Sequence, residues 1–193
     1  MSEVLIVDDE PNIVFSVTEC LGSPTLKVSS ASSGKRAIEM VRSKSFDAVV
    51  LDVRLPDMHG LEVFDRIREV DARLPVIMMT AYAKTETAIE AMRRGAFEYL
   101  LKPVDFRQLR DVVGRAVDAS RLGHVPAVLD EEEPSDAPAD RIIGRSRCMQ
   151  EVYKAVGRVA PQNVPILILG ESGTGKELIA RALYHYKIGR AHV

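Results

Sequence analysis

The sequence predicts an α/β fold: a five-stranded, doubly wound parallel sheet, then a linker and an incomplete second α/β unit. Short apolar runs alternate with segments of helical spacing through the first 119 residues, which is the pattern of βα units. Several of these runs end in a polar residue. In an open parallel sheet, ligands bind beyond the carboxyl ends of the strands, so this regularity predicts a site there.

The strands are expected at residues 3–7, 27–30, 48–52, 75–80 and 98–101, and the helices at residues 11–21, 33–42, 60–69, 84–93 and 106–119. The first, third and fourth strands are nearly continuous apolar runs, which predicts burial on both faces. The second strand is more polar and is expected at an edge. Apolar residues such as Leu61, Phe64 and Ile67 fall on one side of their helix.

The polar residues at the strand ends have a shared chemistry. Asp8 and Asp9 follow the first strand, Asp52 ends the third, Thr80 ends the fourth and Lys102 follows the fifth. Carboxylates gathered in one place repel each other unless a cation offsets their charge, and Mg²⁺ prefers oxygen ligands. An aspartate can attack phosphorus to form an acyl phosphate, while an amine balances the charge on the phosphoryl oxygens. The pattern therefore predicts a metal-assisted phosphoryl site.

Simpler interpretations exist for single members of this set. Asp8 and Asp9 precede Pro11, so they could cap the first helix. Lys102 taken alone could be a solvated surface amine. The five groups taken together favour the phosphoryl site.

Composition excludes several classes of protein. The chain is 46% hydrophobic with a formal net charge of −2, which fits a globular protein without the basic excess of nucleic-acid-binding domains. No apolar run reaches membrane length, and the N-terminus begins with a strand pattern where a signal peptide would have a charged and then an apolar segment. We therefore expect a cytoplasmic location, with no membrane segment and no DNA-binding region.

The composition changes after residue 122. Residues 123–140 are acidic and contain Pro126, Pro134 and Pro138, which predicts a flexible linker. A second unit is expected over residues 141–186, with a helix around residues 149–159 and an apolar strand at residues 166–169.

The second unit contains a phosphate-binding loop pattern, G-x-x-x-x-G-K, between that strand and a helix at residues 178–184. Its residues are Gly170, Glu171, Ser172, Gly173, Thr174, Gly175, Lys176 and Glu177. Glycines let backbone amides face the phosphates, and Lys176 would reach the outer phosphates of a nucleotide such as ATP. Glu177 stands where a Mg²⁺-binding hydroxyl is usual. An ordinary glycine-rich turn is the alternative.

Residues 1–122 resemble a two-component receiver domain, which has a flavodoxin-like fold. The residues that carry the resemblance are Asp8-Asp9, Asp52, Thr80-Ala81, Tyr99 and Lys102-Pro103. The resemblance implies that Asp52 accepts a phosphoryl group from a sensor histidine kinase, and that the domain catalyses its own phosphorylation and dephosphorylation. It implies that Asp8, Asp9, Asp52 and the backbone carbonyl of Arg54 hold Mg²⁺.

The same resemblance implies roles for the remaining residues. Lys102 would contact the phosphoryl group, and its peptide bond to Pro103 would be cis. Thr80 and Tyr99 would move together as the switch that carries the signal to the protein surface.

Residues 142–184 resemble the start of the AAA+ ATPase module of sigma-54-dependent activators of the NtrC family. The residues that carry this resemblance are Ile143-Gly144-Arg145-Ser146, residues 149–153 and residues 170–182. A glutamate after the loop lysine is usual in that family. The resemblance implies ATP, sigma-54 RNA polymerase and homo-oligomerisation on phosphorylation. We expect ATPase activity only in a longer protein, and we interpret residues 187–193 as an artefactual tail, the alternative being a divergent terminus.

The sequence is therefore interpreted as an NtrC-like response regulator. A receiver that acts only as a phosphorylation-dependent interaction module, without ATPase or DNA-binding activity, is the alternative. A haloacid dehalogenase-type phosphatase needs a second carboxylate two residues after the nucleophile, where this sequence has Arg54. A stand-alone P-loop nucleotidase would need more chain after Lys176 to close its core.

Overall fold

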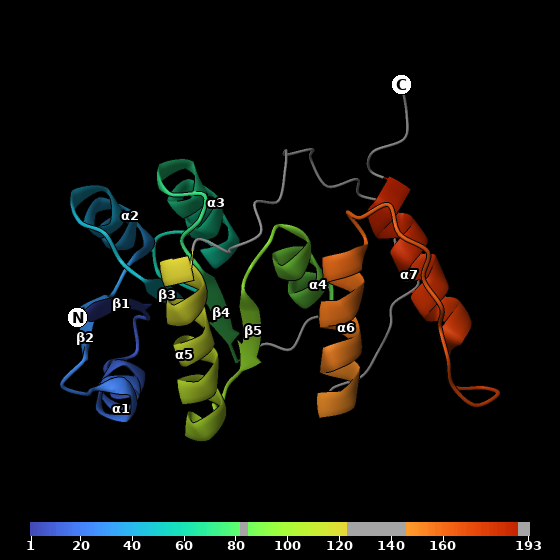
Figure 1. Ribbon diagram of the computed structural model, residues 1–193, viewed down its shortest axis with the longest axis horizontal. Coiled ribbons are helices and arrows are strands. Elements are labelled where there is room, and N and C mark those ends of the chain that lie inside the picture. The colour runs from blue at the N-terminus through green and yellow to red at the C-terminus, as the bar shows by residue number, and fades with distance from the viewer. Residues whose placement is uncertain (82–84, 123–145, 189–193) are drawn as a thin grey trace. The chain divides into compact units, whose positions relative to one another are not determined.

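The computed structural model describes residues 1–81, 85–122 and 146–188 (Figure 1). The strands are β1 Ser2–Val7, β2 Leu26–Ala31, β3 Ala48–Asp52, β4 Val76–Thr80 and β5 Glu98–Leu101. The helices are α1 Pro11–Leu21, α2 Gly34–Ser43, α3 Gly60–Val70, α4 Thr85–Arg93, α5 Phe106–Leu122, α6 Arg147–Val159 and α7 Lys176–Ile188.

The chain divides into two compact units. The first, here called the sheet unit, comprises residues 1–82 and 96–127, and the second, the helical unit, comprises residues 83–95 and 128–193. The predicted linker at residues 123–140 lies outside the described residues, as do Ile143, Gly144 and Arg145. Of residues 187–193, the first two continue α7 and the others lie outside the described residues.

The sheet unit holds one parallel five-stranded sheet with the order β2-β1-β3-β4-β5, which confirms the predicted fold class. β2 lies at an edge, as its polarity predicted. Every residue of β3 and β4 is buried, in agreement with their continuous apolar sequence.

Helices cover both faces of this sheet. α1 and α5 lie on one side and α2 and α3 on the other (Figure 1). Because side chains alternate along a strand, each face receives every second residue. The face toward α1 and α5 has a single apolar core that includes Val4, Ile6, Val50, Val17 and Leu109.

The helical unit is built from α4, α6 and α7. Ile89 of α4 packs with Tyr153 and Val156 of α6 and with Leu183 of α7 in one apolar cluster. At Gly157 α6 approaches the backbone of α4 closely, because a Cβ there would lie 2.5 Å from the carbonyl oxygen of Ile89.

The predicted strand at residues 166–169 is wrong for this structure. These residues form no regular element, and Leu167 and Leu169 are each 81% exposed. A strand needs a hydrogen-bonding neighbour, and within the described residues all paired strands belong to the sheet of β1–β5. The pattern of the segment is that of a buried strand, but no described strand lies beside it.

Candidate functional site

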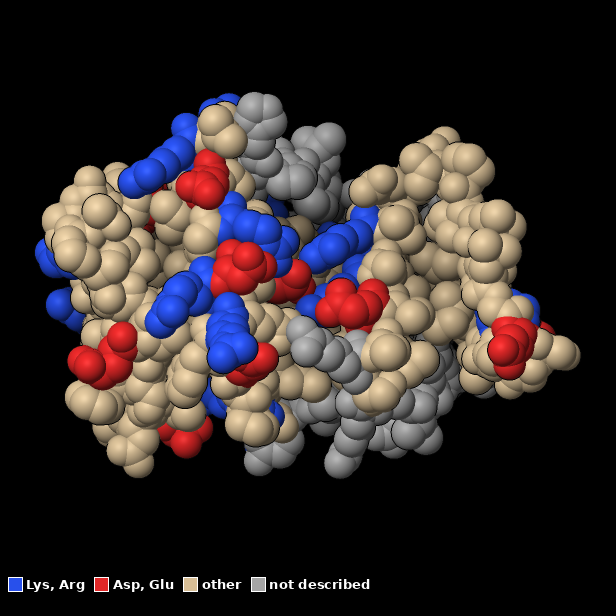
Figure 2. Space-filling view, turned by 60° about the horizontal axis from the view of Figure 1, so that its bottom comes forward, with Lys and Arg blue, Asp and Glu red and all other residues tan. Residues whose placement is uncertain are grey.

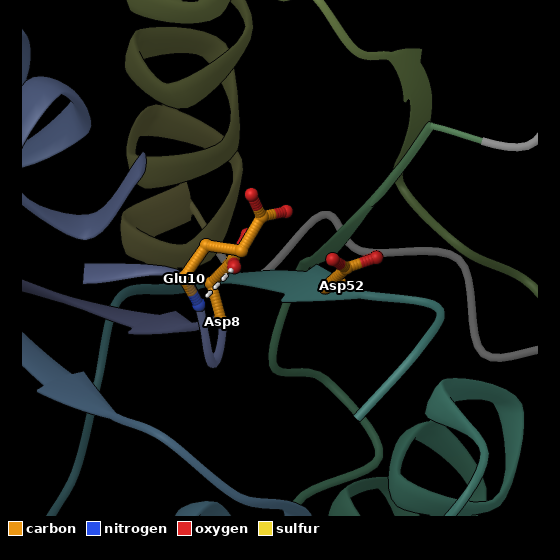
Figure 3. Close-up of side chains that lie close together, drawn as sticks. All are labelled: Asp8, Glu10 and Asp52. Atoms are coloured by element: carbon orange, nitrogen blue, oxygen red, sulfur yellow. Dashed lines mark hydrogen bonds between the residues drawn. The ribbon is translucent and has the colours of Figure 1, made fainter. Parts of the chain in front are cut away.

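The register of the sheet brings two aspartates together. Val7 of β1 pairs with Leu51 of β3, so Asp8 and Asp52 lie side by side just beyond these paired residues. The strand order reverses between β1 and β3, and such a switch point is where α/β sheets bind ligands. Asp8, Glu10 and Asp52 each offer an oxygen, and these oxygens lie within 4.8 Å of one another (Figure 3).

Lys102 places a positive charge among these carboxylates. Its Nζ lies 2.6 Å from Asp52 Oδ2, 2.8 Å from Asp8 Oδ2 and 3.2 Å from Glu10 Oε1. The lysine side chain is only 7% exposed, so the pairs with Asp8 and Asp52 are buried ones. Three carboxylates share one ammonium group, which leaves the site with an excess of negative charge.

Burial and charge shift the titration of these groups. Burial raises the pKa of Asp8, and the neighbouring Lys102 only partly offsets this effect. Burial alone would lower the pKa of Lys102, but the adjacent Asp52 and Asp8 carboxylates raise it well above its ordinary value. Lys102 is therefore charged at every physiological pH.

The loop after β3 fixes the orientation of Asp52. The backbone N–H of Arg54 donates to Asp52 Oδ1 over 3.1 Å. The backbone of Gly60, at the start of α3, packs directly on the strand tip, since a Cβ there would lie 2.3 Å from the carbonyl oxygen of Asp52. Asp57, in the same loop, accepts hydrogen bonds from the backbone N–H groups of Gly34 and Lys35 and so caps α2.

The other residues predicted for the site lie around it. Thr80, at the end of β4, is 1% exposed, and its carbonyl accepts from the N–H of Lys102 over 2.7 Å. The Lys102–Pro103 peptide bond is cis, as the resemblance implied. Tyr99 is 2% exposed, and burial, with a contribution from the Asp52 charge, raises the pKa of its hydroxyl well above the ordinary value.

The structure and the sequence differ over one member of the acidic group. Asp9 is exposed and lies outside the group of three carboxylates, whereas Glu10 belongs to it. Sequence reasoning missed Glu10, and the available signal was the run of three acidic residues after β1. A run of this kind does not indicate which side chains point back over the strand ends.

The residues present fit a divalent cation of the Mg²⁺ type. The donors are carboxylate oxygens, which Mg²⁺ prefers. Asp8 Oδ2 is buried and approaches Lys102, yet it has no hydrogen bond of good geometry with the described residues. A buried carboxylate oxygen with a free lone pair, in a site with excess negative charge, is suited to a cation.

The phosphate-binding loop of the helical unit is a separate candidate site. Gly173 and Gly175 have φ values of 81° and 83°, which glycine adopts without strain. Lys176 opens α7, and its Nζ donates to the carbonyl oxygen of Gly170 over 2.9 Å and also to that of Glu171. The hydroxyl of Thr174 donates to the Glu171 carbonyl over 2.9 Å. The lysine ammonium thus lies inside its own loop.

Comparison with known proteins agrees with this geometry. Residues 4–114 match the response regulator receiver domain. The chain belongs to the response regulator receiver family. Residues 142–192 match the sigma-54 interaction domain, so in this response regulator a receiver domain is followed by a region of the sigma-54 interaction type.

Longer curated proteins match nearly the whole of this chain. The chain is 37% identical over 182 residues to the transcriptional regulatory protein ZraR of Escherichia coli K12, covering 94% of this chain and 40% of that protein. It is 39% identical over 183 residues to the response regulator protein PilR of Pseudomonas aeruginosa, with 94% and 39% covered. The response regulator thus spans about two fifths of the length of the curated relatives it matches.

Solved structures give the same result for the fold. A CheY-like receiver domain protein from Methanospirillum hungatei has a TM-score of 0.60 at 27% identity and covers 63% of this chain and 98% of its own. NtrX from Brucella abortus, solved in complex with ATP, has a TM-score of 0.59 at 32% identity, covering 96% of this chain and 40% of its own.

On the face shown in Figure 2, acidic and basic side chains are interleaved, without a continuous basic stripe. Among the helices that the structure describes, none has the length and apolar character needed to cross a membrane.

Proposed function

We propose that this response regulator is phosphorylated on Asp52 by a sensor histidine kinase and that the phosphorylated receiver controls sigma-54-dependent transcription in the longer protein. The observation that carries the proposal is the position of Asp52. Its carboxylate lies at the tip of the central strand, 2.6 Å from the Lys102 ammonium, in one group with the carboxylates of Asp8 and Glu10.

The transfer is a displacement at phosphorus. A carboxylate oxygen of Asp52 forms the new P–O bond while the P–N bond of a phosphohistidine breaks, and the electron pair of that bond returns to the imidazole nitrogen. Asp52 is held for this attack by the Arg54 N–H on Oδ1. Lys102, already beside Oδ2, can donate to the oxygens of the transferred group. In dephosphorylation a water oxygen attacks the phosphorus and the P–O bond to Asp52 breaks. This step returns the Asp52 carboxylate and free phosphate.

Asp8 and Asp52 would hold Mg²⁺, with Glu10 nearby, and the resemblance adds Asp9 and the backbone carbonyl of Arg54. When bound, the metal offsets the negative charge on the phosphoryl oxygens. Asp8 contributes a carboxylate to this site. The backbone of Asp8 is fixed by the sheet, since its N–H donates to the Ala31 carbonyl over 3.1 Å.

The second part of the chain supports the transcriptional role. The match to the sigma-54 interaction domain over residues 142–192 favours a regulator of sigma-54 polymerase over a receiver that acts alone as an interaction module. Residues 170–177 would bind ATP in the longer protein, and phosphorylation would promote homo-oligomerisation there. Such a regulator works in the cytoplasm.

The test is direct labelling of the whole chain. With acetyl phosphate and Mg²⁺, intact mass should rise by one phosphoryl group, and peptide mapping should place it on Asp52. Asp52→Asn is nearly isosteric and should fold normally but remain unlabelled. Equal labelling of the Asn variant would remove Asp52 from this role. Asp71→Asn serves as a matched control, because Asp71 lies at the opposite end of α3 and should not affect labelling.

A further inference from the structure

We infer that Glu10 is a positioning residue of this site: its carboxylate strengthens cation binding, and by pairing with Lys102 it weakens binding of a phosphoryl group on Asp52. The inference rests on the proposed phosphoryl-accepting function of Asp52. It concerns a residue of the acidic group that the sequence pattern did not single out.

The backbone of Glu10 is fixed from both sides. Its N–H donates to Asp8 Oδ1 over 3.0 Å, a bond drawn in Figure 3. Its carbonyl accepts from the N–H groups of Ile13 and Val14 in the first turn of α1, over 3.0 and 3.1 Å. The side chain therefore starts from a defined point at the edge of the site.

The side chain of Glu10 does not cap the helix that begins after it. Glu10 is the N-cap of α1, yet it makes no side-chain cap hydrogen bond. The N-cap residues of α2 and α6 are Ser33 and Ser146, and both accept such a bond. Serine, threonine, aspartate and asparagine are the usual N-caps because their short side chains reach the backbone N–H groups. Glutamate is not among these residues, and the Glu10 carboxylate, which makes no cap bond, pairs with Lys102.

That carboxylate points into the site. Glu10 Oε1 lies 3.2 Å from Lys102 Nζ, with the lysine 7% exposed and the glutamate 61% exposed. Glu10 thus lies on the solvent side of the buried lysine. Figure 3 shows its side chain extending beyond Asp8, on the same side of the strand ends as the Asp52 carboxylate.

The charge of Glu10 acts with opposite sign on the two ligands. A divalent cation that enters between Asp8 and Asp52 is attracted by a third carboxylate within 4.8 Å. A negatively charged phosphoryl group on Asp52 is repelled by the same carboxylate. It must also compete with Glu10 for Lys102, whose ammonium has a limited number of donors. For one pair of unit charges at this separation in a water-like dielectric, the effect on an equilibrium constant is about fourfold.

The experiment compares Glu10→Gln with the wild-type chain in two binding measurements. Calorimetric titration gives the Kd for Mg²⁺ in the absence of any phosphoryl group. Titration with beryllofluoride at saturating Mg²⁺ gives the Kd for a phosphoryl analogue. The matched control is Glu19→Gln on α1, because Glu19 is exposed and lies nine residues further along the same helix.

Glu10→Gln should raise the Mg²⁺ Kd by about fourfold or more and lower the beryllofluoride Kd by about fourfold. Glu19→Gln should leave both within about twofold, since its charge is screened over more than a Debye length. A disturbance of the fold would weaken the binding of both ligands. Changes of opposite sign in the two Kd values therefore identify the electrostatic role of Glu10.

Other outcomes separate the two proposals. If wild type binds both ligands but Glu10→Gln changes both constants in one direction, or changes neither, the role of Glu10 is refuted and that of Asp52 stands. If the wild-type chain binds neither Mg²⁺ nor beryllofluoride, the proposed function fails and the inference fails with it.

Discussion

The Lys102 ammonium nitrogen lies 2.6 Å from Asp52 Oδ2, although β4 separates the strands that supply the two residues. The lysine follows β5 and reaches across the end of β4 to the tip of β3. This pairing gives the site an internal cation that is present before any ligand binds.

Lys102→Ala should therefore destabilise the metal-free protein. The substitution leaves Asp8 and Asp52 buried without a counter-charge, and breaking a buried pair costs about 3 kcal/mol or more. Saturating Mg²⁺ should recover part of the loss, because the metal replaces the missing positive charge. Urea unfolding followed by circular dichroism, with and without Mg²⁺, measures both effects. Lys35→Ala is the control at an exposed position of α2. A stability loss that Mg²⁺ does not reduce would contradict this account.

Asp57→Ala should lower the free energy of unfolding by about 1 kcal/mol at neutral pH, which is typical for the loss of a helix cap. Partial burial alone would raise the pKa of Asp57, but the hydrogen bonds from Lys35 and Gly34 hold that pKa below its ordinary value.

This prediction has a defined pH dependence. Because the folded pKa is depressed, the stabilisation is fully present above the unfolded value of about 3.9 and is lost as the pH falls through the folded pKa. The stability difference between wild type and Asp57→Ala should therefore shrink below about pH 4. Glu69→Ala, at an exposed position of α3, is the control. A difference that stays constant down to the acid transition would show that the charge of Asp57 plays no part.

Phosphorylation should change amide hydrogen exchange at residues 85–101 more than at α1 or α2. Thr80 and Tyr99 are both buried, and Asp52 is close enough to contribute to the raised pKa of the Tyr99 hydroxyl. A new phosphoryl group would attract the Thr80 hydroxyl, and the resulting movement of Thr80 would shift the preferred position of the Tyr99 side chain. Thr80→Val keeps the shape but removes that hydroxyl. It should still be labelled, yet show a smaller exchange response. An unchanged response in this variant would exclude Thr80 from the switch.

The 193-residue chain should not hydrolyse ATP. The Lys176 ammonium is bound to carbonyl groups of its own loop, and a nucleotide would have to displace it. The segment before the loop, with Leu167 and Leu169 exposed, forms no strand that could fix the loop. Hydrolysis also needs the loop to hold the phosphates rigidly. Phosphate release should be the same for the wild-type chain and Lys176→Ala. Turnover that is lost in the variant would show a competent site.

The sheet unit could be predicted closely because its sequence signals are local. Pro11 marks the start of α1, and the helix was expected at residues 11–21, as observed. Continuous apolar runs located β3 and β4, and the parallel order then placed Asp8 beside Asp52. The position of Lys102 relative to Asp52 followed from the same topology.

The differences concern features that depend on partners distant in the sequence. Glu10 escaped prediction because the direction of its side chain depends on Lys102, which is 92 residues away. The strand expected at residues 166–169 depends on a neighbouring strand that the described residues do not supply. In both cases the local sequence pattern identified the residue types but did not predict which distant residues they contact. The roles of Thr80 and of the loop at residues 170–177 remain predictions for the experiments above, and the role of Asp9 as a Mg²⁺ ligand also remains a prediction.

The packing of Gly60 has a consequence for variation at that position. A Cβ at residue 60 would lie 2.3 Å from the carbonyl oxygen of Asp52 and 2.6 Å from Val53 Cα, so any side chain there must displace the end of β3. A library randomised at residue 60 and selected only for a folded protein should therefore return glycine. The requirement to fold is then enough to restrict residue 60 to glycine. The backbone geometry that positions Asp52 would be kept even without selection for signalling.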